Sequence, residues 1–304
     1  MKKLRKTKRR VSGAWTRGGL EKRTKEMWHM PKRTNLEQMV GAMKILLDKK
    51  LDLNNKTWTS GRKETFNTEM GKRNLTQSGG PLSQQSRRTF EALLKYLGLI
   101  YLDNISDPPM LRVTKGGGFL ATNPTEALKL QMLKLQITNP VIGEDCQNIL
   151  VFPFRVTLRL LIDLGYLTYD EIGYILFMKM KKQSDYEDIK NLILQFRNKS
   201  SGEKKKIIDD FKKTPEGKVT LAKAPSVGYF ISLCEDTGLC ERDSKKHIIQ
   251  LVQGKEEEIR KLLKEFENYE AFDFGDNLDL WINYYGDVER KCPPKLFTIK
   301  FRCE

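Results

Sequence analysis

Apolar side chains recur every three or four positions along most of this chain, which predicts a mainly helical fold. In residues 36–51, for example, Leu36, Met39 and Val40 fall on one helical face. The same spacing, together with capping residues, predicts further helices over 83–97, 122–137, 156–164, 168–180, 186–197, 226–237 and 255–268. The stretch 150–197 is the most apolar, and we expect its helices to form a tight core.

Two polar stretches interrupt this pattern. Residues 52–82 are rich in Asn, Thr, Gly and Ser and contain few hydrophobic residues. We interpret them as a loop, or as a surface that becomes ordered on a ligand. Residues 198–223 are lysine-rich and polar, and we expect a linker or an extended contact loop there.

A helix followed directly by two short strands is predicted twice, after residue 83 and again after residue 226. The strands are expected at 99–102 and 110–114 in the first case and at 239–242 and 247–252 in the second. This order is typical of a winged helix, in which the helix before the hairpin enters the DNA major groove and the loop touches the backbone. We interpret the glycines at 116–118 as the turn after the first hairpin.

The fold class predicted from these elements is mainly α with small β-hairpins, an α+β arrangement. Two winged-helix-like DNA-binding units would be joined by a helical core. Along the chain we expect a basic N-terminal arm (1–27), a first recognition subdomain (28–145), a helical connector (146–200) and a second recognition subdomain (201–304).

The positive charge is concentrated at the start of the chain. Residues 1–75 contain 21 Lys and Arg against 7 Asp and Glu, whereas the whole chain has 55 against 39. A positive field on an otherwise balanced protein indicates a polyanionic partner, and nucleic acid is the commonest one. Residues 1–10 alone also fit a basic tail that only aids solubility. The tryptophans at positions 15, 28 and 58 argue against disorder in 11–75, and we interpret them as packing residues.

The remaining composition excludes several classes of protein. No apolar run reaches the roughly 18 residues of a membrane helix, and none follows the basic N-terminus as in a secretory signal. Five scattered cysteines fit free thiols in a reducing bacterial cytoplasm. Asp273 with Glu289 and Lys291 has a spacing that a metal-dependent nuclease could use, as does Glu216 with Lys218, but neither set lies on a convincing core strand. We therefore predict no catalytic residue, no metal ligand and no cofactor in this chain.

The order of segments resembles a known family of DNA-cleaving enzymes. The resemblance covers roughly 28–300 and rests on Trp28 and the polar run after it, and on a collinear series of segments. The segments are 97–123 (LGLIYLD…LRVTKGGGFLATN), 128–136 (LKLQMLKLQ), 148–177 (NILVFPFRVTLRLLIDLGYLTYDEIGYILF), 189–198 (IKNLILQFRN), 229–240 (YFISLCEDTGLC) and 282–287 (INYYGD). Together they resemble the N-terminal, DNA-recognising half of AlwI-like type IIS restriction endonucleases and their strand-nicking relatives.

This resemblance implies a function that the composition alone does not. In that family the recognition part binds a short asymmetric sequence of duplex DNA, as a monomer. A C-terminal PD-(D/E)xK domain that needs Mg²⁺ then cuts one or both strands nearby. Because the present chain stops where the recognition part would end, we expect catalysis to belong to a separate nuclease domain or subunit.

The chemistry of base reading selects the candidate contact residues. Lys and Arg neutralise phosphates, while Arg, Asn and Gln form paired hydrogen bonds with base edges. We expect contacts from the segment after Trp28, from the polar stretch, from the first helix–hairpin unit and from the second. The candidates are Lys32, Arg33 and Asn35; Arg62, Lys63, Asn67, Lys72, Arg73, Asn74 and Gln77; Ser83, Gln84, Gln85, Arg87 and Arg88; and Lys218, Lys223, Ser226, Tyr229 and Ser232.

Two other function classes stay open on the sequence alone. A non-enzymatic winged-helix DNA-binding protein, such as a replication initiator or a repressor, would need a palindromic or repeated site. A ribosomal or other RNA-binding protein would also explain the basic N-terminus, although the chain shows no motif for stacking single-stranded bases.

Overall fold

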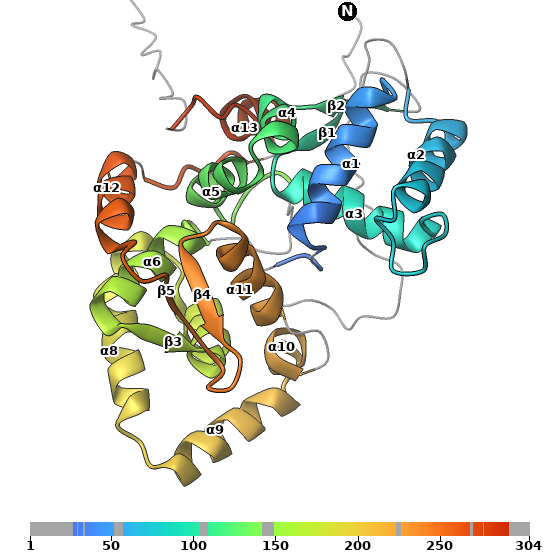
Figure 1. Ribbon diagram of the computed structural model, residues 1–304. Helices are drawn as coiled ribbons and strands as arrows, with labels where there is room; N and C mark the ends of the chain where they lie inside the picture. Colours follow the sequence, from blue (N-terminus) through green and yellow to red (C-terminus); the bar gives the residue numbers. More distant parts are fainter. Residues whose placement is uncertain are drawn as a thin grey trace, which may run out of the picture.

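The computed structural model describes residues 27–28, 30–32, 34–51, 57–103, 109–141, 149–222, 226–267, 270–275 and 277–291. Within these ranges the protein is mainly helical, with one two-stranded and one three-stranded antiparallel sheet. The predicted α+β class is therefore confirmed. Figure 1 shows the two sheets in separate parts of the molecule, each surrounded by helices.

The first unit contains three helices and a hairpin. They are α1 (Leu36–Asp48), α2 (Ser60–Lys72), α3 (Gln84–Tyr96), β1 (Ile100–Asp103) and β2 (Met110–Val113). The two strands are antiparallel, with Ile100 opposite Val113. Thr57, which precedes α2, forms a single bridge with Met110 of β2. Because Met110 also pairs with Asp103, β2 lies between β1 and the extended residue Thr57.

The second unit repeats this order of elements. It consists of α6 (Pro153–Leu164), β3 (Tyr166–Thr168), the π-helix η2 (Glu171–Leu176) running into α7 (Phe177–Lys179), α11 (Ser226–Asp236), β4 (Cys240–Asp243) and β5 (Ile248–Leu251). The strand order is β3–β5–β4, so the last strand again lies in the middle. Both units thus run helix, extended segment, helix, helix, strand, strand.

The second unit carries an insertion between its second and third helices. The inserted elements are η3 (Gln183–Asp185), α8 (Tyr186–Arg197), α9 (Ser201–Lys213), α10 (Pro215–Gly217) and η4 (Lys218–Ala222). In Figure 1, α9 forms the lower edge of the molecule. The expectation of a linker or loop at 198–223 is therefore wrong. Ile208 and Phe211 bury one face of α9, and a capping box between Ser200 and Glu203 starts it.

Trp28 and helix α13 each pack on the unit that is distant from them in the sequence. Near the N-terminus, the Trp28 indole packs on Phe177 and Phe230 of the second unit, with ring centroids 5.3 and 6.2 Å away. Its Nε1 donates to the carbonyl of Met180 at 2.8 Å. Near the C-terminus, α12 (Glu256–Phe266) is followed by α13 (Leu278–Tyr285), which returns to the first unit. There Tyr285 lies against Gly98, at the end of α3.

Two further helices connect the units and hold α13. These are α4 (Lys115–Thr122) and α5 (Pro124–Lys134). On α5, Gln131 Nε2 donates to the carbonyls of Leu97 and Tyr285 at 2.8 and 3.0 Å. Lys134 is 1% exposed, and its Nζ donates to the carbonyls of Tyr284, Tyr285 and Asp287. This amine satisfies carbonyls that the end of α13 leaves without helical partners.

Several predicted element ends are confirmed. Ser83 caps α3 by accepting a hydrogen bond from the amide of Ser86, and Gly98 ends that helix with φ of +64°. Thr168 and Glu171 form the predicted capping box, with amide contacts of 2.8 and 3.1 Å. Gly238 follows α11 with φ of +71°.

Two other predictions for the first unit are wrong. The polar stretch 52–82 is not a loop throughout, because residues 60–72 form α2. The stretch contains few apolar residues, but three of them, Trp58, Phe66 and Met70, lie in the core. The glycines at 116–118 do not form a turn, because they belong to α4.

The segment boundary expected at residue 200 divides elements that pair with each other. β3 lies before it, whereas β5, its neighbour in the sheet, lies after it. A division at this residue would therefore cut through one sheet.

Candidate nucleic-acid interface

Helix α3 presents its first two turns to solvent. Its apolar side chains Phe90, Leu93 and Leu94 are buried against the first unit. On the other side, Gln84 and Arg88 are exposed one turn apart, and Gln85 is exposed beside them. In the part of the chain that the structure describes, no hydrogen bond or ion pair engages these three side chains. They are therefore free to donate to a partner.

Arg87 sits differently from its neighbour Arg88. It is 7% exposed, and its Nε donates to Oε1 of Glu91 at 2.9 Å. The same Oε1 accepts from the indole Nε1 of Trp58 at 3.0 Å. Arg87 is thus held by a carboxylate rather than extended into solvent.

Three predicted contact residues of α2 are half-buried, namely Arg62, Lys63 and Asn67. Lys63 lies close enough to Lys95 of α3 for their charges to repel, although burial is the larger cause of the lowered pKa of Lys95. Arg62 Nη1 donates to the carbonyl of Thr57 at 3.3 Å. The carbonyl of Asn67 accepts from the amide of Leu82, which joins α2 to the start of α3. Asn67 therefore lies next to the start of α3, whereas Lys63 lies near its last turn.

The remaining predicted residues of the polar stretch lie at the other end of α2. Arg73 is paired with Asp48 at 3.0 Å, and Lys72 with Glu69 at 3.2 Å. Asn74 has φ of +55° in the turn after the helix, and Gln77 is exposed in the following loop. This end of α2 adjoins the loop before α3, since Gly71 lies against Gly80 and Pro81.

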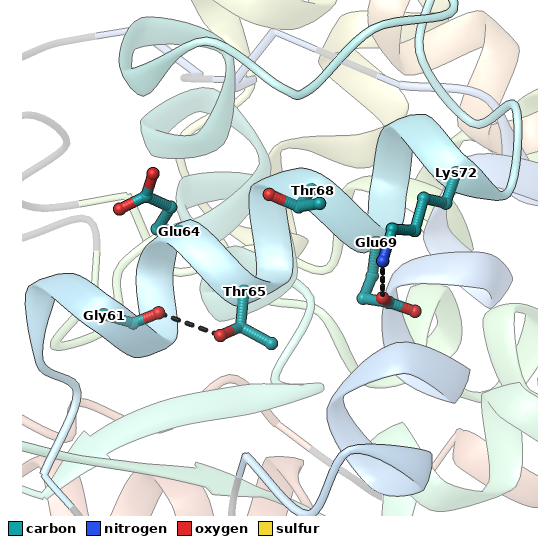
Figure 2. A pocket seen from close by; sticks show the side chains of 6 residues that line it. All are labelled: Gly61, Glu64, Thr65, Thr68, Glu69 and Lys72. Atoms are coloured by element: carbon teal, nitrogen blue, oxygen red, sulfur yellow. Dashed lines mark hydrogen bonds and ion pairs between the residues drawn. The ribbon is translucent and has the colours of Figure 1, made fainter.

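A shallow hollow on the exposed face of α2 is not suited to phosphate. Its volume is about 380 Å³, and Figure 2 shows the six residues that line it, Gly61, Glu64, Thr65, Thr68, Glu69 and Lys72. Lys72 and Lys49 both bind Glu69, and the hydrogen bond from Lys72 is the main cause that lowers the pKa of its carboxyl group. With Glu64 beside them, the hollow carries two carboxylates that would repel an anion.

The segment before α1 contributes one exposed cation. Lys32 is exposed, and Asn35 caps α1 in a capping box with Gln38. Arg33 lies outside the described residues. Asn35 therefore serves as a helix cap, and the presence of Gln38 three residues later in the sequence is typical of that role.

In the second unit, the helix that corresponds to α3 is covered. Helix α11 packs against α5, β4 and η4. Ser226 is 3% exposed and donates to the carbonyl of Val219, while Ser232 is 7% exposed and accepts from Arg242. The structure does not present these two serines to a duplex, because η4 and β4 cover them. Tyr229 and Lys218 are half-buried, and Lys223 lies outside the described residues.

The turn between β4 and β5 is exposed instead. Lys246 pairs with Asp243 at 3.2 Å, whereas the structure shows Lys245 exposed and without a described ion-pair partner. Sequence reasoning placed this turn correctly but did not select its lysines as contacts. The presence of two adjacent lysines at the tip of a predicted hairpin could have identified them as contact residues.

The residues weighed as a nuclease site each have a different partner. Glu289 lies within 3.4 Å of Lys115, Lys291 binds Glu265, and Asp273 accepts from the amide of Gly275. Among the described residues, no three His, Cys, Asp or Glu side chains are grouped as a metal site would require. The helices in the described ranges are too short or too polar to cross a membrane.

Residues 125–282 match the family model described as "Type II restriction endonuclease HgaI, N-terminal domain". The chain belongs to this family. The matched range begins in α5, covers the whole second unit and ends in α13. The predicted resemblance to the N-terminal part of a restriction endonuclease is thus confirmed at the level of type II enzymes.

A solved structure extends the likeness of this HgaI-type N-terminal domain to the first unit. The BpuJ1 endonuclease binding domain, solved in complex with pyrene- and phenanthrene-modified DNA, matches with a TM-score of 0.51 at 17% identity. The match covers 86% of this chain and 98% of that chain. At this identity it shows a shared fold. No curated protein matches the chain.

Proposed function

We propose that this chain is the sequence-specific DNA-recognition module of a type II restriction endonuclease. The observation that carries the proposal is the exposed start of α3, where Gln84, Gln85 and Arg88 offer unpaired donors. Gln and Arg are the side chains that form paired hydrogen bonds with adenine and guanine edges in the major groove. The family match supports the same function, and so does the fold shared with a protein solved on DNA.

We further propose that both units are winged helices. In that fold a helix and a strand precede two helices and a hairpin, and the third helix enters the major groove. The element order and the central position of the last strand support this assignment in both units. Helix α3 and helix α11 then hold equivalent places.

Helices α3 and α11 hold equivalent places but differ in exposure, so we infer different roles for the two units. Helix α3 is exposed and would read bases, with Lys63 beside it for a phosphate. Helix α11 is covered, so the second unit would contact the backbone through the β4–β5 turn and Lys245. Phosphate contacts of this kind set the position of the protein on the duplex without selecting a sequence.

For the whole enzyme we propose a type IIS arrangement, similar to AlwI-like endonucleases or their nicking relatives. The chain would bind a short asymmetric site as a monomer, in the bacterial cytoplasm. A separate Mg²⁺-dependent nuclease domain or subunit would cut the DNA. The resemblance in sequence supports this arrangement, and so does a family defined as an N-terminal domain of a restriction endonuclease.

Selection from a pool of randomised duplexes tests the proposal. At physiological ionic strength, we expect the purified chain to enrich one short non-palindromic word and to bind it as a monomer. A palindromic word bound by a dimer would favour a repressor-like protein instead. Equal affinity for all duplexes would overturn the recognition function.

A further inference from the structure

Two side chains of α3 and one from the segment before α2 meet behind the exposed start of α3. Oε1 of Glu91 accepts two hydrogen bonds, from Nε of Arg87 at 2.9 Å and from Nε1 of Trp58 at 3.0 Å. Glu91 stands one turn after Arg87 on the same helix, whereas Trp58 comes from the segment before α2. The carboxylate is therefore fixed from two directions.

Trp58 itself has little freedom to move. It is 2% exposed, its ring packs edge-on against Phe66, with centroids 6.2 Å apart, and its amide donates to the carbonyl of Pro109 at 2.7 Å. The indole thus connects the hairpin and α2 to the carboxylate of Glu91. A carboxylate held by a rigid indole can in turn fix an arginine.

The contact leaves the outer half of the Arg87 guanidinium unused. Only Nε binds Glu91, and no described residue accepts from Nη1 or Nη2. Neither terminal nitrogen is among the fully buried atoms that lack a partner, so the small exposed part of Arg87 includes them. Two parallel N–H groups of this kind match the O6 and N7 acceptors of guanine.

Arg87 also lies where a base-reading residue is expected. It follows Gln84 and precedes Arg88 in the second turn of α3, and the N-terminal residues of an inserted helix are those that reach base edges. A carboxylate beside DNA costs electrostatic energy, because the phosphates repel it. This repulsion of Glu91 is offset if its carboxylate orients the guanidinium of Arg87, which the DNA attracts.

We propose that Glu91 and Trp58 are positioning residues that aim Arg87 at one guanine of the recognised site. The inference rests on the proposed function and extends it, because it states which base Arg87 reads and what fixes its geometry. An arginine pre-oriented in this way loses less side-chain freedom on binding than a free one. Its selectivity for guanine should therefore depend on two residues that touch no DNA.

The test uses Glu91→Gln, which keeps an oxygen acceptor for Trp58 and Arg87 but removes the charge. We expect binding to the selected duplex to weaken about tenfold, and the preference for guanine at one position to relax. Binding to unrelated duplexes should stay equal or become tighter, because one negative charge is gone. Glu69→Gln on α2 is the matched control, since it removes a carboxylate that binds Lys49 and Lys72 and has no contact with Arg87 or Trp58 among the described residues.

Two more variants separate positioning from support of the fold. Arg87→Lys keeps the charge but cannot form the paired contact, so guanine preference should disappear while general affinity remains. Trp58→Phe keeps the ring and removes only the N–H donor, and we expect a smaller relaxation at the same base. All variants are compared by thermal melting.

A purely structural ion pair would give a different result. The Glu91→Gln variant would then melt at a lower temperature and would bind all duplexes less well, with an unchanged order of preference. That outcome overturns the positioning role while the recognition function stands. If the unmodified chain shows no sequence preference, the recognition function itself fails.

Discussion

At the scale of single residues, neighbours in sequence have different surroundings. Arg87 and Arg88 look equivalent in the sequence, yet one is bound to Glu91 and the other is exposed. The helical face that includes Gln84 and Arg88 could be predicted from periodicity alone. The contact of Glu91 with Trp58 could not, because 33 positions separate the two residues and only the fold brings them together.

Arg88→Ala should weaken binding to the selected duplex by about 1–3 kcal/mol and relax one base position. The reason is that Arg88 is exposed with a free guanidinium that can reach a base edge. Titration of labelled duplexes that differ at single positions measures both effects. Equal losses on the selected and on scrambled duplexes would make Arg88 a phosphate contact.

Lys134 gives a second prediction at this scale, in the stability of the protein against pH. Burial, partly offset by Asp287, lowers the pKa of its amine from 10.5 to about 7. Between these two values the unfolded chain binds the proton more strongly than the folded protein. The contribution of Lys134 to the free energy of unfolding should therefore increase as the pH rises from about 7 to 10.5.

Comparison with Lys134→Met isolates that contribution. The variant should be less stable, because the carbonyls at the end of α13 lose their donor. The gap between the two proteins should widen as the pH rises from about 7 to 10 in chemical denaturation. Parallel stability curves would show that the amine keeps its ordinary pKa in the fold.

At the scale of elements, hydrophobic pattern located most helices and both hairpins. It failed for α2 and α9, because each buries only a few large side chains and exposes polar residues elsewhere. It also failed for the three glycines of α4. Glycine usually disfavours a helix, but here it allows close packing, since a Cβ on Gly117 would lie 2.2 Å from the carbonyl oxygen of Leu99.

Alanine substitutions at two neighbouring glycines test this account of α4. Gly117→Ala should destabilise the protein by about 1–3 kcal/mol, because backbone must shift to admit the methyl group. Gly118→Ala should stabilise it by about 0.5–1 kcal/mol, because nothing lies within 4 Å of the added Cβ and alanine favours a helix. Urea denaturation measures both. Destabilisation of similar size at both sites would contradict the helical packing described here.

At the scale of the whole molecule, one topology occurs twice with different exposure of the third helix. The sequence predicted two helix–hairpin units, but not that α11 would be covered, because its cover comes from α5 and from the inserted η4. Base reading is therefore expected from the first unit alone. The excess of Lys and Arg lies in residues 1–75, which include α1 and α2 of the first unit.

Deletion of residues 1–10 should weaken binding to all duplexes alike. Seven of these ten residues are Lys or Arg, so the segment should bind phosphates rather than bases. The slope of log affinity against log salt should become shallower by about 0.9 for each phosphate that the shortened chain no longer neutralises. A change in the selected word would instead assign base reading to this segment.

The packing of α13 on the first unit has a consequence for synthesis on the ribosome. Tyr285 of α13 is fully buried and lies against Gly98 of the first unit, so that unit lacks part of its core until α13 has been translated. At about 5–20 residues per second, the interval between emergence of β2 and of α13 is on the order of ten seconds. During that interval α3, which would read DNA, packs on an incomplete core. A nascent chain should therefore begin to bind a duplex only after α13 has emerged.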